Sequence, residues 1–269
     1  MTSLIFIFLS TGLISGFIAG LLGVGGGIII IPITYFVLIN LGYSNDIVMH
    51  VSIASSLGII CFTSISSIRS HLKLGNVNIE IVKKWIFGII AGSLIGSLLA
   101  SNISGEILLI IFVSLALIIS INMILQQEPI LIIKDIPKSK SINFIISFLI
   151  GFLSVLIGIG GGSFSVPTLS MFSRKIHEAV GTSAALGFLI AFPGAIIFMI
   201  TGSFNENTPD YSIGYLNIII VILVSSTSVF TANIGAKISS KINKITLKRI
   251  FAIFLLFTCA SLIIEHFII

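Results

Sequence analysis

Hydrophobic residues run in long blocks along this chain, separated by short polar breaks. Stretches approaching the roughly 20 residues that cross a bilayer as a helix recur from one end to the other. Apolar segments lie at residues 4–22, 28–40, 47–68, 79–101, 105–125, 142–158, 163–173, 178–201, 213–236 and 246–268. The longest polar interruption, at 126–141, falls near the middle. The pattern predicts an all-α polytopic membrane protein built in two halves.

The two halves share a pattern of glycine and proline. "GFIAGLLGVGGGIIIIP" begins at Gly16 and "GFLSVLIGIGGGSFSVP" at Gly151, so their shared glycines and prolines keep an offset of 135 residues. His50 and His177 open a second matching block, and two further blocks follow in the same order. Collinear blocks indicate a duplication. We expect three units: membrane repeat 1 at 1–126, a cytoplasmic linker at 127–140 and membrane repeat 2 at 141–269.

The basic charges of equivalent loops change sides between the halves. The loop at 69–78 carries lysine and arginine, while its counterpart at 202–212 carries only acidic charge. The loop at 41–46 is acidic, while its counterpart holds Arg174 and Lys175. Because Lys and Arg mark cytoplasmic loops, we expect inverted repeats, which need an odd number of crossings each. The alternative is a parallel four-plus-four bundle in which each glycine segment is one kinked span.

Composition supports a membrane protein and excludes several classes. The chain is 56% hydrophobic and 9% charged, with a mean hydropathy of +1.23, and so lacks the charge that a soluble surface needs. The net charge of +5 fits loop lysines and arginines, and no basic patch indicates nucleic acid. Cys61 and Cys259 lie far apart in apolar segments, and we interpret them as inert. We expect no metal, no cofactor and no cleaved signal peptide.

The glycine clusters explain why a flexible backbone stands inside apolar segments. Non-helical backbone is tolerated in a bilayer only where protein buries it or it lines a wet cavity. We therefore expect a helix–break–helix in each half, and about eight full-length spans when each broken segment is counted once. Amide groups at the start of the returning helix can bind an anion without a cationic side chain. The expected breaks lie at Gly23 and Gly158, with Pro32 and Pro167 in the first turn or two of the returning helix.

Polar side chains of the second block are candidates for the same site. Ser55 and Ser56 match Thr182 and Ser183, whose hydroxyls can donate to an anion or bond back to their own helix. His50 and His177 stand at helix ends, where they could couple proton movement or simply sit at the interface. The expected substrate-binding residues are Gly25, Gly26, Gly27, Ser55, Ser56, Gly160, Gly161, Gly162, Ser163, Thr182 and Ser183. Glycines that merely let helices pack closely are the alternative.

These blocks resemble the sulfite exporter TauE/SafE family of bacterial membrane transporters. The resemblance covers nearly the whole chain and includes "HVSIASSLGII", "HEAVGTSAALGF" and "GAKISSKINKITLKRIFAIFLL". It implies an inner-membrane permease for small, often sulfur-containing anions such as sulfite, organosulfonates or carboxylates. The first repeat departs from the family's "VGTSL" form, with Ala54 and Ser55 in place of Gly and Thr. Related thiosulfate carriers use cysteines along the path, and the two cysteines here match no such pattern.

We therefore expect a multi-pass permease or exporter in the bacterial inner membrane, with a small anion and the lipid bilayer as its partners. Transport would occur by alternating access at the interface of the repeats. The alternatives are a passive anion channel, an accessory or sensor subunit, and a membrane enzyme using the serine of "GGSF" with His177. Ile28 stands where the first repeat would need that serine, and no third catalytic group is evident. We expect no catalytic residues.

Overall fold

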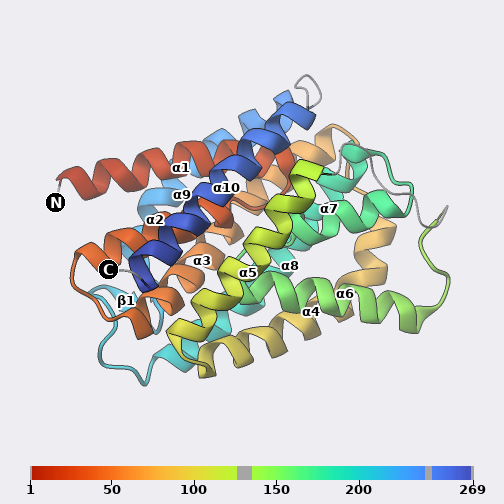
Figure 1. The fold of residues 1–269 in the computed structure, drawn as a ribbon. Helices are drawn as coiled ribbons and strands as arrows, with labels where there is room; N and C mark the ends of the chain where they lie inside the picture. Colours follow the sequence, from red (N-terminus) through yellow and green to blue (C-terminus); the bar gives the residue numbers. More distant parts are fainter. Residues whose placement is uncertain (1, 126–134, 240–243, 268–269) are drawn as a thin grey trace.

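The computed structural model describes residues 2–125, 135–239 and 244–267, and almost all of its regular structure is helical (Figure 1). In chain order the first half contains α1 (Thr2–Leu22), α2 (Gly27–Asn40), α3 (Asn45–Lys73), α4 (Ile79–Asn102) and α5 (Gly105–Leu125). The second contains α6 (Lys140–Leu156), α7 (Gly162–Met171), α8 (Ile176–Gly202), α9 (Ile218–Ile238) and α10 (Lys244–Phe267). The expected all-α fold is confirmed.

Each half begins with a helix that is interrupted at its glycine cluster. α1 ends at Leu22 and α2 begins at Gly27, while α6 ends at Leu156 and α7 begins at Gly162. Pro32 and Pro167 lie in the second turn of the returning helices, as expected. In Figure 1, α2 turns back toward the end of the molecule where α1 starts. Each glycine cluster is therefore a hairpin break and not a kink in one continuous span.

Helices of the two halves pack against one another in matched pairs. Gly12, Gly16 and Gly20 of α1 face Val224, Ser228 and Ala232 of α9, so these helices run parallel. Along α4, Gly88, Gly92 and Gly96 face Phe144, Phe148 and Phe152 of α6 in the same way. Without side chains at these positions, the backbones approach closely enough to pack without a hydrophobic driving force. The first helix of each half therefore packs against the fourth helix of the other.

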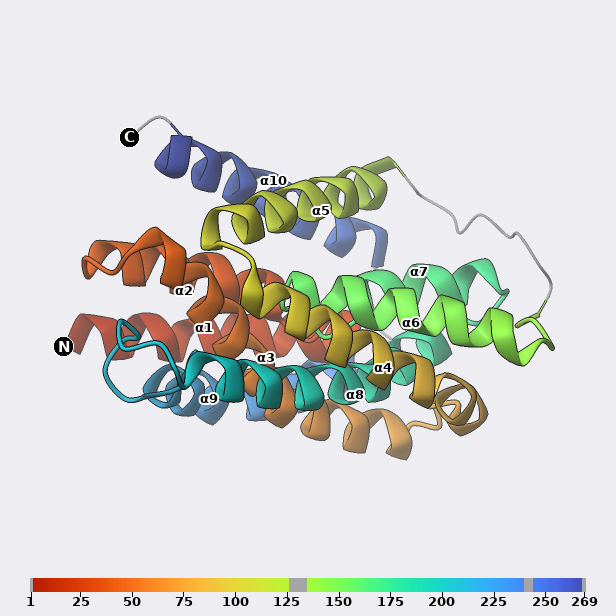
Figure 2. The same ribbon diagram turned by 90° about the horizontal axis from the view of Figure 1, so that it is seen from below.

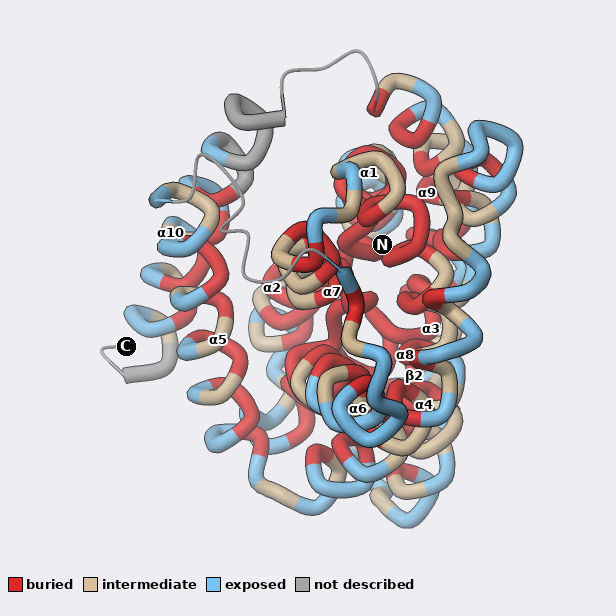
Figure 3. Tube along the Cα trace, turned by 90° about the vertical axis from the view of Figure 1, so that its right-hand side faces the viewer, coloured by how far each residue is buried: buried red, intermediate tan, exposed pale blue. Residues whose placement is uncertain are grey.

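The outer surface is apolar, as a bilayer requires. Six helices of the described chain are long and apolar enough to cross a membrane: α1, α3, α4, α5, α8 and α9. α2 and α6 are shorter apolar helices. Large aromatic side chains stand on the outside, with Phe6, Phe87, Phe230 and Phe257 each more than 70% exposed. Figure 3 shows α5 and α10 side by side at one edge of the bundle, with buried residues facing inward. Exposed aromatic carbon of this extent fits a lipid environment.

The structure differs from the sequence expectation in the apolar segment at 213–236. Its first residues form a small hairpin, in which β1 (Ser212–Ile213) pairs antiparallel with β2 (Leu216–Asn217). Gly214 supplies the positive φ of +57° at the turn, and α9 then starts at Ile218. Hydrophobicity alone missed the hairpin because Ile213 and Leu216 continue the apolar run.

Candidate functional site

The two glycine breaks contact each other in the interior of the molecule. A Cβ placed on Gly25 would lie 2.8 Å from the Cα of Gly160, and one on Gly160 would lie 3.0 Å from the Cα of Gly25. Gly26 and Gly161 are the N-caps of α2 and α7, and both adopt the left-handed conformation, with φ of 81° and 78°. Such backbone is readily available only to glycine. The sequence clusters are therefore brought into direct contact, one against the other.

Ser56 and Ser183 hold the opposite break in place. The Ser56 hydroxyl donates to the carbonyl of Gly158 at 2.8 Å, and the Ser183 hydroxyl donates to the carbonyl of Gly23 at 3.2 Å. Both serines are fully buried. Each hydroxyl has a single hydrogen to donate, and here that hydrogen satisfies a carbonyl at the broken end of a helix. These two bonds tie α3 to the second break and α8 to the first.

Ser55 and Thr182 have a second matched role. The Asn217 amide donates to Ser55 Oγ at 3.0 Å, and the Asn78 amide donates to Thr182 Oγ1 at 3.0 Å. Asn78 and Asn217 in turn cap α4 and α9, accepting hydrogen bonds from the amides of Ile81 and Ile220. A capping asparagine typically stabilises a helix by about 1 kcal/mol. The hydroxyls predicted from the sequence therefore organise the loops beside the breaks.

Backbone amides remain as donors at the breaks. In the hydrogen bonds of the described residues, the amides of Gly25, Gly26 and Gly27 have no acceptor. At the second break, by contrast, the Gly161 amide donates to the carbonyl of Ile159 at 2.7 Å. Ser163 follows on the first turn of α7 and is half-buried. The start of α2 therefore offers more unbonded donors than the start of α7, and these donors and the helix dipole favour negative charge.

A narrow cavity lies against the first break, and sequence reasoning did not anticipate its walls. Besides the glycines Gly23 and Gly25, it is lined by Thr63, Ser64 and Ser67 of α3 and by Ala184 of α8. The space between its atoms is about 190 Å³, part of it open to the outside, and it is too narrow for a water molecule. The three hydroxyl residues share one face of α3 at helical spacing. This spacing could have identified the cavity wall from the sequence. It is a weak signal, because α3 carries many other serines.

His50 and His177 lie in different surroundings. His50 is 4% exposed, and its ring stacks on Tyr215 with centroids 4.8 Å apart. Its two ring nitrogens lie 2.7 Å from the carbonyl oxygen of Asp46 and 3.1 Å from that of Ile103. His177, at the equivalent position, lines an open hollow of about 770 Å³ at the other end of the molecule. The two histidines are therefore not brought together, and neither lines the cavity at the first break.

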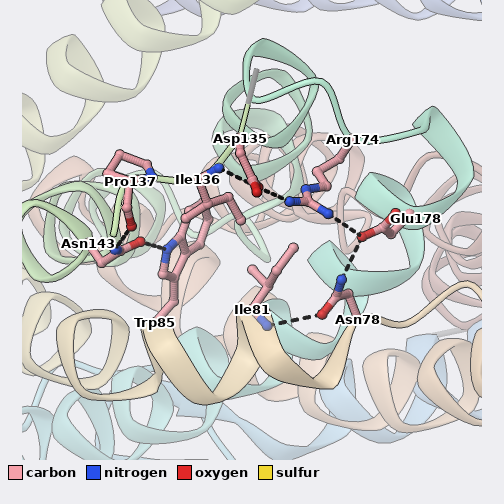
Figure 4. A network of polar contacts seen from close by, with 9 residues as sticks. All are labelled: Asn78, Ile81, Trp85, Asp135, Ile136, Pro137, Asn143, Arg174 and Glu178. Atoms are coloured by element: carbon pink, nitrogen blue, oxygen red, sulfur yellow. Dashed lines mark hydrogen bonds and ion pairs between the residues drawn. The ribbon is translucent and has the colours of Figure 1, made fainter. Parts of the chain in front are cut away.

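Polar contacts join the linker to both halves beside that hollow (Figure 4). Asp135 pairs with Arg174, which lies 3.8 Å from Glu178, and the Asn78 side chain donates to Glu178 at 2.7 Å. The pKa of Asp135 lies below its usual range, because the Ile136 amide donates to it and the Arg174 guanidinium lies beside it. The pair therefore persists as pH falls until that lowered pKa is reached. Of the three lysines in the linker, Lys134 lies outside the described residues, and Lys138 and Lys140 lie within them.

Comparison with known proteins supports one family. The family model described as "Sulfite exporter TauE/SafE" matches residues 8–262. A "Probable membrane transporter protein" of Haemophilus influenzae is 33% identical over 269 residues, covering 98% of this chain and 100% of the relative. The "Probable membrane transporter protein YunE" of Bacillus subtilis is 28% identical, covering 94% and 95%. A probable membrane transporter of Methanocaldococcus jannaschii is 28% identical, covering 86% and 85%. No solved structure matches significantly.

Proposed function

The chain belongs to the sulfite exporter TauE/SafE family of multi-pass membrane transporters, and we propose that it carries a small anion across the bacterial inner membrane. The substrate is sulfite, an organosulfonate or a related carboxylate, bound where the two glycine breaks meet. The observation that carries this proposal is the contact of Gly25 with Gly160, beside amides that have no acceptor. Broken helices of this kind place their positive ends at anionic groups in other transporters.

The absence of charge at this place favours an electrostatic role for the backbone. The cavity against the first break is lined by glycine, alanine and hydroxyl residues. A lysine or arginine buried there within a membrane protein would carry a large desolvation cost. Amide dipoles carry only partial charge, so they can bind an anion and still release it. We propose that the hydroxyls of Ser56 and Ser183 keep these amides in position.

We further propose that the halves are inverted repeats. Equivalent contacts occur twice: Ser56 with Gly158 matches Ser183 with Gly23, and α1 beside α9 matches α4 beside α6. Because the paired helices run parallel while α1 and α4 run in opposite directions (Figure 2), α1 and α6 point opposite ways. Alternating access would then open the central site to one membrane face and afterwards to the other.

Topology is testable by cysteine labelling. α3 ends with Lys73 and α6 starts two residues after Lys138, both at one end of the molecule, and the segment between α8 and β1, which contains Glu206, lies at the other end (Figure 2). In a background in which Cys61 and Cys259 are alanine, we expect Lys73→Cys and Lys138→Cys to react from the cytoplasm. Glu206→Cys should react only from outside. Labelling of Glu206→Cys and Lys73→Cys from the same side would contradict the inverted arrangement.

Flux through the purified protein tests the function. In proteoliposomes we would measure sulfite, sulfate, sulfoacetate, taurine, acetate and pyruvate, with and without a pH gradient. The expected result is saturable flux of one anion. Flux that rises linearly with anion concentration, without saturation, would favour the alternative of a passive channel. A dependence on the pH gradient would support coupling through His50 or His177, and its absence would contradict that role.

A further inference from the structure

The hydroxyl residues of α3 that line the cavity beside the first break are not repeated at the equivalent positions of α8. Ser56 and Ser183 are equivalent, since each donates to a carbonyl of the opposite break. At that offset of 127 residues, Thr63, Ser64 and Ser67 correspond to Ile190, Ala191 and Gly194. At the second break, a Cβ placed on Gly161 would lie only 2.4 Å from the Ile190 side chain. Ile190 of α8 thus packs against the second break where α3 places hydroxyls at the first, although the hydroxyls of Ser154 and Ser165 also lie near Gly161 and have no partner among the described residues.

One of these hydroxyls, that of Ser67, lacks the bonds that buried serines usually form. Ser67 is 2% exposed, and within the described part of the chain its Oγ has no hydrogen-bond partner. Ser64 is 4% exposed, and its Oγ lies beside the contact of Gly187 with the Gly160 carbonyl. Serines in membrane helices commonly bond back to their own helix, as Ser70 does to Ser66. An unpartnered buried hydroxyl is costly, so a ligand that accepts from it would remove that cost.

We infer that the substrate binds at the first break, off the axis that relates the two halves, with its oxygens held by Ser64, Ser67 and the amide of Gly25. This inference rests on the proposed function and adds its binding residues. The donors are hydroxyl and amide groups on a neutral wall, which suits a small oxoanion such as a sulfite or sulfonate group. Because the cavity is too narrow for a water molecule, α3 and α8 must separate for the anion to enter.

The inference makes Ser67 a binding residue and not a structural one. For Ser67→Ala we expect the KM of the transported anion to rise about tenfold or more, because a hydrogen bond to a charged group is lost. The thermal midpoint of the ligand-free protein should stay equal or rise, because the hydroxyl has no partner to lose. Ser67→Val fills the cavity, and its KM should rise further.

Ser66→Ala is the matched control on the same helix. Its hydroxyl donates to the carbonyl of Val229 at 2.6 Å and does not line the cavity. We expect its KM to stay within about twofold of the wild type, with a lowered thermal midpoint. Flux in proteoliposomes with the anion panel above gives KM for each variant. Saturable wild-type flux with an unchanged KM in both Ser67 variants would overturn this inference alone. No wild-type flux of any panel anion would overturn it together with the proposed function.

Discussion

Gly25→Ala should reduce the maximal rate of anion flux by an order of magnitude or more. Gly25 has a φ of +83°, which costs a residue with a Cβ about 1–2 kcal/mol. The added methyl would also lie 2.8 Å from the Cα of Gly160, so the two breaks must separate where the amides are presented. Each 1.4 kcal/mol lost at the rate-limiting step is about tenfold in rate. Flux in proteoliposomes measures the effect.

A matched control separates backbone strain from the clash. Gly42 has nearly the same φ, +86°, but a Cβ there would meet nothing within 4 Å. Gly42→Ala therefore carries the strain alone, at a turn distant from the breaks, and flux should stay near the wild-type value. Gly160→Val adds a clash with Gly25 and Ile60 without a positive φ, and should behave like Gly25→Ala. Normal flux in both break variants, at normal levels of folded protein, would show that the site lies elsewhere.

The largest effect on stability is expected where glycines join the two halves. A Cβ on Gly20 would lie 1.9 Å from the carbonyl oxygen of Ala232, and one on Gly92 would lie 2.1 Å from that of Phe148. Overpacking typically costs about 1–3 kcal/mol, and the cost is higher when the neighbour is backbone that cannot rotate away. Gly20→Val and Gly92→Val should therefore yield little monodisperse protein.

Size-exclusion chromatography in detergent checks that expectation. Ile14→Val and Ile95→Val serve as controls, because both isoleucines are more than half exposed on the outer faces of the same helices. They should elute as the wild type does. Monodisperse Gly20→Val and Gly92→Val protein with an unaltered thermal midpoint would mean that α1–α9 and α4–α6 do not pack this closely.

Helices and breaks were predictable from local pattern, whereas most contacts of the site were not. The apolar segment expected at 79–101 corresponds to the helix Ile79–Asn102 in the structure, because apolar runs between polar loops determine membrane helices. The pairing of Ser56 with Ser183 was visible in the duplicated blocks. Each of these hydroxyls bonds a carbonyl of the opposite break. This contact depends on how the two hairpins cross, and no local sequence pattern determines that crossing. Likewise, only packing shows that Ser67, among the serines of α3, faces the cavity.

α1 packs against α9 and α4 against α6, so each of these contacts can form only after a helix of the second half has been synthesised. α9 is synthesised some 200 residues after α1, so the glycine face of α1 has no partner helix in the membrane until then. α4 waits only for α6, which follows soon after. A ribosome stalled after the first half would thus leave behind a set of helices lacking both contacts. The synthesis of α9 thus completes the packing of α1, which is exposed to quality-control proteases until α9 arrives.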